Sequence, residues 1–301
     1  MLFRSQELAQ ERMEQNAQTL LETFPDSGRT GYLLRRTFDE VTQVVDELYD
    51  ELSVSAFRPK FCELEFSARG ALPGVAFAGE RCRGVVEGFV DRVDVWQSGG
   101  RPYVRVVDYK TGKKSFDYTN VLHGRGLQML LYLFALVRQG GHLLHGEPLP
   151  AGVLYFPARI ERVSVRDRLA QAEIEKERRK QLRRSGVLLN SDPVLEAMEP
   201  CGGSPRFLPY TLDKEGRKTG DLASFAQLSQ LERFVFRTVA ALGDELADGR
   251  IDPDPCIRDA KDSACAFCPY SEVCAGHEQP RWLKKITAEE FWQTLERREH
   301  G

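Results

Sequence analysis

The sequence Gly88-Phe-Val-Asp91-Arg-Val-Asp94, followed by Val107-Asp108-Tyr-Lys110-Thr-Gly112, decides the fold that we expect for this chain. Both segments lie in runs rich in Val, Tyr and Phe, which are typical of strands, and Gly99-Gly100 between them predicts a tight turn. The two segments therefore predict an antiparallel hairpin that carries carboxylates and a lysine.

Faces of this hairpin follow from the alternation of side chains along a strand. A turn at the start of the glycine pair would place Asp91 opposite Val106. In that register Asp91, Asp108 and Lys110 share one face, whereas Asp94 lies on the other. Diagonal carboxylates on neighbouring strands are about 7–8 Å apart at Cβ, so both side chains can reach one divalent cation.

Oxygen ligands favour Mg²⁺ or Mn²⁺, and an ion held beside a lysine is typical of metal-assisted hydrolysis. The alternative is a surface hairpin stabilised by cross-strand ion pairs.

The surrounding pattern predicts an α/β fold with a mixed sheet flanked by helices and followed by a cysteine-rich segment. The expected helices span residues 5–24, 36–52, 119–139, 159–184 and 222–246. The expected strands span residues 61–66, 85–96, 103–109 and 152–156, the last almost wholly apolar. Residues 185–220 are rich in Pro, Gly and Ser and predict an irregular excursion. We expect four parts, 1–60, 61–184, 185–250 and 251–301.

Composition excludes several classes of protein. With 301 residues, 42% of them apolar and a net charge of −3, the chain is a folded protein without an overall positive field. The longest apolar stretch, Leu127 to Val137, is about half the ~20 residues that a membrane span needs. The charged N-terminus lacks a signal-peptide core, so we expect a cytoplasmic protein that does not cross a membrane.

The expected helix after the hairpin carries polar groups on an apolar surface. Gln128 and Tyr132 are one turn apart, with Arg125 a turn earlier. Buried polar groups need partners, and a neighbouring active site would supply them. Helix capping, or one buried hydrogen bond from the tyrosine hydroxyl, is the alternative.

A dense run of cysteines lies near the C-terminus. Cys265, Cys268 and Cys274 form a C-x₂-C-x₅-C motif, which suits zinc or an iron–sulfur cluster. Cys256 is the nearest candidate for a fourth ligand by sequence. The remaining three cysteines are interpreted as isolated buried residues: Cys62, Cys82 and Cys201.

Three of these motifs resemble, in order and spacing, the nuclease domain of the RecB-like branch of the PD-(D/E)XK superfamily. They are Gly-Phe-Val-Asp91-Arg-Val-Asp, Val-Asp108-Tyr-Lys110-Thr-Gly and Gly-Leu-Gln128-x-x-x-Tyr132. The resemblance implies a restriction-endonuclease-like core that cleaves DNA with a divalent metal. Asp91 and Asp108 would bind the metal, and Lys110 would be the catalytic lysine. Gln128 and Tyr132 would belong to the additional motif beside the site, and the preceding strand offers Glu65 as a weaker supporting carboxylate.

The cysteine run extends the resemblance to the C-terminal part of AddB-like helicase–nuclease subunits, which the segments 186–198 and 251–255 also resemble. This implies a [4Fe–4S] cluster on Cys265, Cys268 and Cys274, with zinc as the alternative, and a structural role for the cluster. It also implies an AddA-like helicase–nuclease partner and exonuclease action on DNA in double-strand-break repair and end resection.

The family's upstream cysteine and its first-helix histidine have no counterpart here, since the first such residues are Cys62 and His123. We therefore expect the chain to begin inside the domain, and Cys256 is the candidate substitute for the missing cysteine. The rival hypotheses are a catalytically silent DNA-end-binding or scaffolding module of the same fold, and a zinc-ribbon adaptor.

The expected helix at 159–184 carries ten Arg or Lys and five Asp or Glu residues. Such a run can follow DNA phosphates without reading sequence. Its interleaved Glu173, Glu175 and Glu177 favour the alternative, a solvated helix with internal ion pairs.

Overall fold

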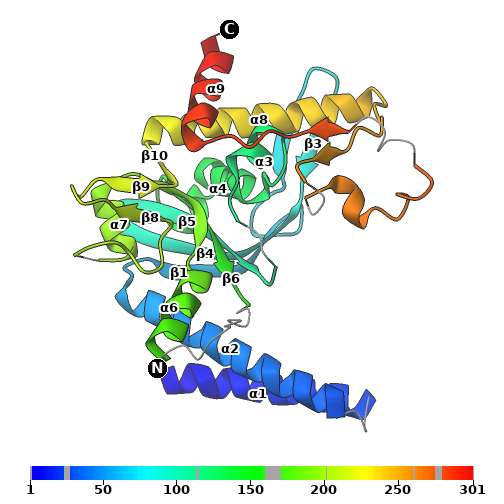
Figure 1. Cartoon of the computed structure of the whole chain (residues 1–301). Helices are drawn as coiled ribbons and strands as arrows, with labels where there is room; N and C mark the ends of the chain where they lie inside the picture. Colours follow the sequence, from blue (N-terminus) through cyan, green and yellow to red (C-terminus); the bar gives the residue numbers. More distant parts are fainter. Residues whose placement is uncertain are drawn as a thin grey trace.

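A six-stranded mixed sheet forms the centre of the molecule (Figure 1). The computed structural model describes residues 2–23, 28–112, 115–159, 171–200, 202–259, 262–274 and 280–300. In sheet order the strands are β1 (Arg58–Phe66), β4 (Gly88–Ser98), β5 (Arg101–Lys110), β6 (Leu149–Pro157), β7 (Ser185–Leu189) and β10 (Leu222–Ala223). The β5–β6 and β7–β10 pairs are parallel and the other three are antiparallel. The expected mixed sheet is confirmed.

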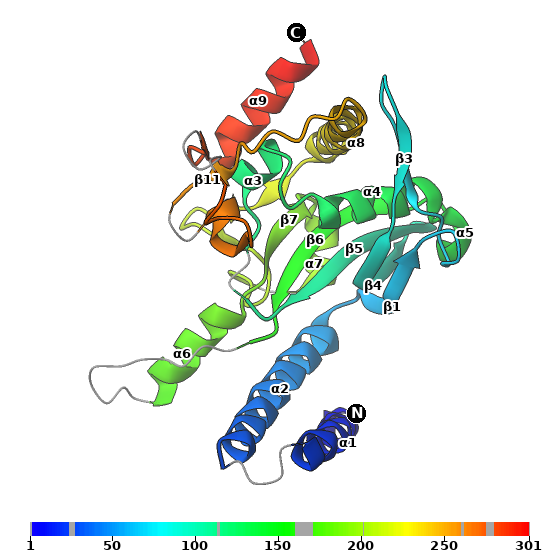
Figure 2. The ribbon, with the colours of Figure 1, turned by 90° about the vertical axis from the view of Figure 1, so that its right-hand side faces the viewer.

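Helices cover both faces of this sheet (Figure 2). The described helices are α1 (Leu2–Thr23), α2 (Gly28–Val54), α3 (Tyr118–Leu122), α4 (Gln128–Gln139), α5 (Gly141–Leu144), α6 (Gln171–Leu182), α7 (Asp192–Met198), α8 (Phe225–Ala247) and α9 (Ala288–His300). Helix α4 contacts β5 and β6 on one face and α8 behind it, while the C-terminal half of α2 covers the other face. Among the described helices, none is long and apolar enough to span a bilayer.

In the described part of the chain, three two-stranded sheets lie outside the central one. They pair β2 (Val75–Ala78) with β3 (Arg83–Val86), β8 (Tyr210–Leu212) with β9 (Lys218–Gly220), and β11 (Cys256–Ile257) with β12 (Arg281–Trp282). The β2–β3 hairpin interrupts the chain between β1 and β4, but these two strands still pair as the predicted meander requires.

The hairpin register differs from the prediction by two residues. Val106 lies opposite Val93 rather than Asp91, and Ser98 lies opposite Arg101. The reason is the turn: Gly99 and Gly100 both have positive φ, 58° and 75°, and so form a two-residue loop between the paired strands. An even shift keeps every side chain on its face in a regular strand.

Two other predictions need correction. The expected helix 119–139 is divided into α3 and α4, because Gly124 and Gly126 have φ values of +74° and +67°, which are outside the helical region. The segment 185–220 contains β7, an interior strand of the sheet, and the short helix α7. The prediction overlooked Gly186-Val-Leu-Leu189, whose apolar residues are buried between neighbouring layers. For 159–184, the described helix is α6 alone, and residues 160–170 lie outside the described residues.

A cluster of buried charges joins α2 to the sheet, and we call it the buried charge network. Glu51 is 1% exposed and accepts hydrogen bonds from Arg105 at 2.9 Å and from Arg184 at 2.6 and 3.0 Å. Asp94 accepts from Arg105 at 2.8 Å and contacts Arg92 at 2.9 Å. Burial opposes ionisation of Glu51, but the three arginines outweigh it and lower the pKa of its carboxyl to about 2. Asp94 is therefore bound by two arginines on the face of the sheet that α2 covers, where it stabilises the fold.

Candidate active site

Asp91 lies where the regular β4–β5 pairing ends. The last paired residues are Arg92 and Val107, and the Asp91 carboxylate then accepts a hydrogen bond from the backbone N–H of Tyr109 at 2.8 Å. Tyr109 stands between Asp108 and Lys110 in the sequence. The Asp91 carboxylate is thus held against the part of β5 that carries the other two predicted site residues.

Asp108 and Lys110 form an ion pair through the carboxylate Oδ2 and the ammonium Nζ. Asp108 is 7% exposed, while the lysine is half-buried, so the pair stands at the border between the interior and solvent. The strand pattern that predicted a shared face for these two side chains is supported by this contact.

Tyr155 is a neighbour of Asp108 that the sequence analysis missed. It is paired with Asp108 across the parallel β5–β6 ladder and is 4% exposed. Burial, and then the negative charge of Asp108, raise the pKa of the Tyr155 hydroxyl to about 12. The phenol therefore stays protonated at neutral pH and acts as a hydrogen-bond donor. The only available signal was one tyrosine in an otherwise apolar strand.

The two predicted residues on α4 occupy different environments. Gln128 begins the helix and is exposed. Tyr132 is 3% exposed, and its ring stacks on Phe66 with a centroid separation of 5.0 Å. Its hydroxyl lies close to Gly88, where an added Cβ would come within 1.9 Å of it. Tyr132 therefore supports the start of the strand that carries Asp91.

The supporting carboxylate predicted on β1 is placed beside the same strand. Glu65 lies opposite Phe89 and accepts a hydrogen bond from the Ser67 hydroxyl at 2.7 Å. Within the described ranges, no three His, Cys, Asp or Glu side chains are grouped so as to hold a metal ion. The arrangement on β4 and β5 offers two carboxylates and one amine, and a cation shared by Asp91 and Asp108 stays a prediction.

The cysteine segment forms a second candidate site. Cys265, Cys268 and Cys274 line one cavity of about 530 Å³, whose other walls include residues 252–255. Cys256 directly follows this wall, in β11, and does not itself line the cavity. The three thiols are the soft donors that zinc and iron–sulfur clusters require, although they are not drawn together into coordinating geometry. Cys201 lies outside the described residues.

Ion pairs join this segment to the helices that follow β5. Arg125 donates to Asp262 at 2.8 Å, and Asp262 also contacts Arg258 at 2.6 Å. Arg258 in turn donates to Asp117, the N-cap of α3. Arg125, which the sequence analysis places near the proposed active site, thus also contacts the cysteine segment and helps to position it.

Comparisons with known proteins agree with this geometry. The model of the PD-(D/E)XK nuclease superfamily matches residues 2–275. The chain is 35% identical over 258 residues to the AddB component of the ATP-dependent helicase/deoxyribonuclease of Moorella thermoacetica, an alignment that covers 84% of this chain and 22% of that protein. It is 28% identical over 283 residues to the protein of the same name from Thermoanaerobacter sp. strain X514, which covers 90% of this chain and 24% of that one.

The chain thus spans less than a quarter of the length of these curated relatives. The family match covers most of the chain, and the mixed sheet flanked by helices is the restriction-endonuclease-like fold that the sequence predicted. With its strands, its carboxylates and its lysine in the order that the motifs require, the chain belongs to the PD-(D/E)XK nuclease superfamily.

Proposed function

We propose that this chain is a divalent-metal-dependent deoxyribonuclease domain that hydrolyses DNA phosphodiester bonds. The observation that carries the proposal is the juxtaposition on β4 and β5: the Asp108–Lys110 ion pair, with the Asp91 carboxylate bound to the N–H between them. In a member of this nuclease superfamily, such a set of side chains has a direct chemical use.

Each of the three residues has its own role. Asp91 and Asp108 would hold Mg²⁺ or Mn²⁺, since carboxylate oxygens are the ligands these ions prefer. A bound ion activates water and stabilises charge on the phosphate. Lys110 contacts Asp108 and can orient the attacking water or the scissile phosphate. Tyr132 packs against the start of β4, and Gln128, exposed at the beginning of the same helix, would contact the DNA.

Cleavage of end-labelled linear DNA with Mg²⁺ tests the proposal. We expect Asp108→Asn, which keeps the size of the side chain but removes its charge, to slow cleavage by about 100-fold or more. Asp39→Asn, an exposed substitution on α2, is the matched control and should leave the rate unchanged. Equal rates for wild type and Asp108→Asn would contradict the nuclease assignment. DNA binding without any cleavage by the wild type would favour a silent end-binding module.

The biological setting follows from the relatives' names. They are AddB components of ATP-dependent helicase/deoxyribonucleases, so we propose that the chain acts with an AddA-like helicase–nuclease partner. In that assembly it would act as an exonuclease on one unwound strand, without sequence preference, during end resection in the cytoplasm. We expect co-purification with that partner. We also expect the pair to cleave both strands of a linear duplex, and its Asp108→Asn form to lose cleavage of one strand only.

The cysteine cavity is proposed to hold a [4Fe–4S] cluster. Support comes from the C-x₂-C-x₅-C spacing and from three thiols that line one cavity, with Cys256 as the candidate fourth ligand. Anaerobically purified protein should be brown and contain iron and sulfide, and Cys268→Ser should lose both. A colourless protein that contains one zinc ion would support the zinc alternative instead.

A further inference from the structure

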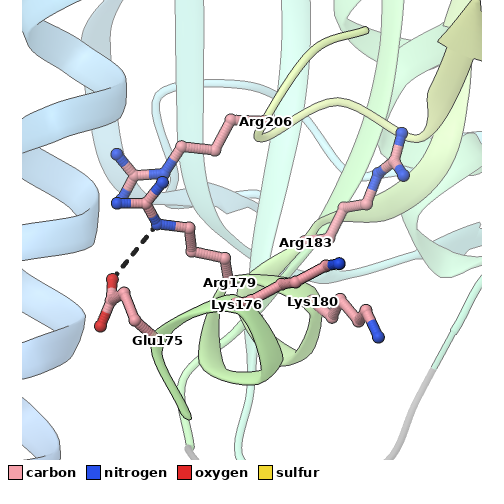
Figure 3. A pocket seen from close by; sticks show the side chains of 6 residues that line it. All are labelled: Glu175, Lys176, Arg179, Lys180, Arg183 and Arg206. Carbon is pink, nitrogen blue, oxygen red and sulfur yellow. Dashed lines mark hydrogen bonds and ion pairs between the residues drawn. The ribbon is translucent and has the colours of Figure 1, made fainter. Parts of the chain in front are cut away.

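A positively charged pocket lies on α6, outside the candidate active site. Lys176, Arg179, Lys180 and Arg183 recur at helical spacing and so share one face. With Arg206, from the segment before β8, they line a cavity of about 520 Å³ whose only described acidic lining residue is Glu175 (Figure 3). Five cations and one carboxylate give this basic pocket a formal charge of +4, in a chain whose net charge is −3.

Two arginines of the basic pocket are fixed by the fold. Arg183 donates to the carbonyl of Leu208 at 2.9 Å and also to that of Tyr210. Arg206 donates to Asp50 at 3.0 Å and to Glu47, and its Nε has no acceptor in the described part of the chain. Their guanidinium groups are therefore held in place before any ligand arrives, which lowers the entropy lost on binding.

The internal ion pairs of α6 leave a surplus of positive charge. Arg179 pairs with Glu175 at 3.2 Å and Lys180 with Glu177 at 2.9 Å, and all four side chains are about half exposed. Such surface pairs are worth less than about 1 kcal/mol, so an incoming anion can replace them.

The basic pocket stands at the same end of the sheet as the candidate active site, but on the face that α2 covers, where Arg206 contacts Glu47 and Asp50. Asp108 is paired with Tyr155, and Tyr155 with Ser185, two residues after Arg183. Two strand spacings separate Asp108 from Ser185, about 10 Å. In Figures 1 and 2, α6 lies just beyond the end of β6 at which β5 also ends.

We propose that the basic pocket binds the sugar–phosphate backbone of single-stranded DNA and guides it to Asp108. None of the pocket's described lining residues is aromatic, so these residues offer no platform for stacking bases. Their donors are those that recognise phosphate oxygens without reading sequence. The proposal rests on the proposed nuclease function for its ligand, but its geometry is independent of the catalytic carboxylates.

Binding of a labelled oligothymidylate, measured by fluorescence anisotropy in EDTA between 50 mM and 1 M salt, tests this site. The variant Lys176→Gln/Lys180→Gln changes two exposed lysines and leaves the anchored arginines in place. Because each lost phosphate contact lowers the salt slope by about 0.7, the slope should fall by about 1.4, which corresponds to roughly 25-fold weaker binding at 100 mM than for the wild type. Glu175→Gln should have the opposite effect and tighten binding, which damage to the helix would not do.

Lys284→Gln/Lys285→Gln, which removes two exposed lysines after β12, is the charge-matched control and should leave the slope unchanged. An unchanged slope for Lys176→Gln/Lys180→Gln, or an equal fall for the control, would overturn the proposal. The Asp108→Asn variant separates it from the proposed function: it should retain DNA binding while losing cleavage. If Asp108→Asn retains both DNA binding and cleavage, the nuclease proposal fails, whereas the salt slopes of the lysine variants still decide whether the basic pocket binds DNA.

Discussion

Replacing Glu51 with glutamine should destabilise the fold far more than the same change on the surface of the same helix. Glu51 is 1% exposed, and its carboxylate faces Arg92, Arg105 and Arg184. Glu51→Gln keeps the shape of the side chain but leaves three buried cations with one negative charge fewer. The matched control is Glu40→Gln, which removes only a partly exposed ion pair with Arg36, one helical turn earlier.

The pKa of Glu51 sets the size of the effect. A fall from 4.5 to about 2 on folding corresponds to about 3 kcal/mol of stability at neutral pH. Removal of one partner from a buried ion network costs about 3–5 kcal/mol by independent reasoning. Glu40→Gln should cost less than about 0.5 kcal/mol. Because the folded-state pKa is lowered, the contribution of Glu51 is complete above pH 4.5 and is lost as the pH falls towards 2.

Urea denaturation followed by tryptophan fluorescence measures both variants. At pH 7 we expect a difference of about 3 kcal/mol between Glu51→Gln and the wild type, and at pH 3.5 the difference should shrink by about 1 kcal/mol because the unfolded wild type then takes up a proton at Glu51. If Glu51→Gln were as stable as Glu40→Gln, or if its deficit did not change with pH, the reasoning about the buried charge network would be refuted.

Three further outcomes are expected. Gly88→Ala should cost about 1–3 kcal/mol in chemical denaturation because its Cβ meets the Tyr132 hydroxyl and its φ of +158° disfavours a side chain. Tyr132→Phe in the same chain should recover the part that comes from the contact, and two additive losses would contradict that contact. Asp262→Asn should make the segment around the cysteines easier to cleave in limited proteolysis, since it weakens the ion pairs to Arg125 and Arg258, and an unchanged digestion rate would argue against that anchoring. Asp244→Ala should speed amide hydrogen exchange at residues 80–82, because the Asp244 carboxylate accepts hydrogen bonds from their three backbone N–H groups. No change in exchange is expected at β5.

Local patterns predicted the elements that carry the candidate site. Alternation along β1, β4 and β5 predicted three adjacent strands, and the apolar run of β6 predicted a further buried strand. The spacing of Asp108 and Lys110 predicted a shared face, on which the two side chains form an ion pair. The register was wrong by two residues because it depended on which side of Gly99 the chain reverses, and both glycines adopt positive φ. A sequence pattern fixes the face of a side chain more firmly than its partner across the ladder.

The long-range features had no such local signal. Arg184 comes from a segment expected to end a charged surface helix, yet it is 2% exposed and paired with Glu51, 133 residues earlier. The pairing of Arg125 with Asp262 likewise joins residues that are distant in sequence, so the spacing of the α4 motif could not distinguish an active-site group from an anchor. Tyr155 became recognisable only when the parallel ladder placed it beside Asp108.

Arg206 belongs to two sets of charges at once, and this has a thermodynamic consequence. It lines the basic pocket and shares Glu47 with the buried Arg184. An anion bound to Arg206 and the Glu47 carboxylate then share one guanidinium, so occupancy at the surface and the strength of the interior contact between Glu47 and Arg184 must influence one another equally in both directions. The affinity for single-stranded DNA and the free energy of unfolding should therefore depend on one another in this protein, through the guanidinium of Arg206.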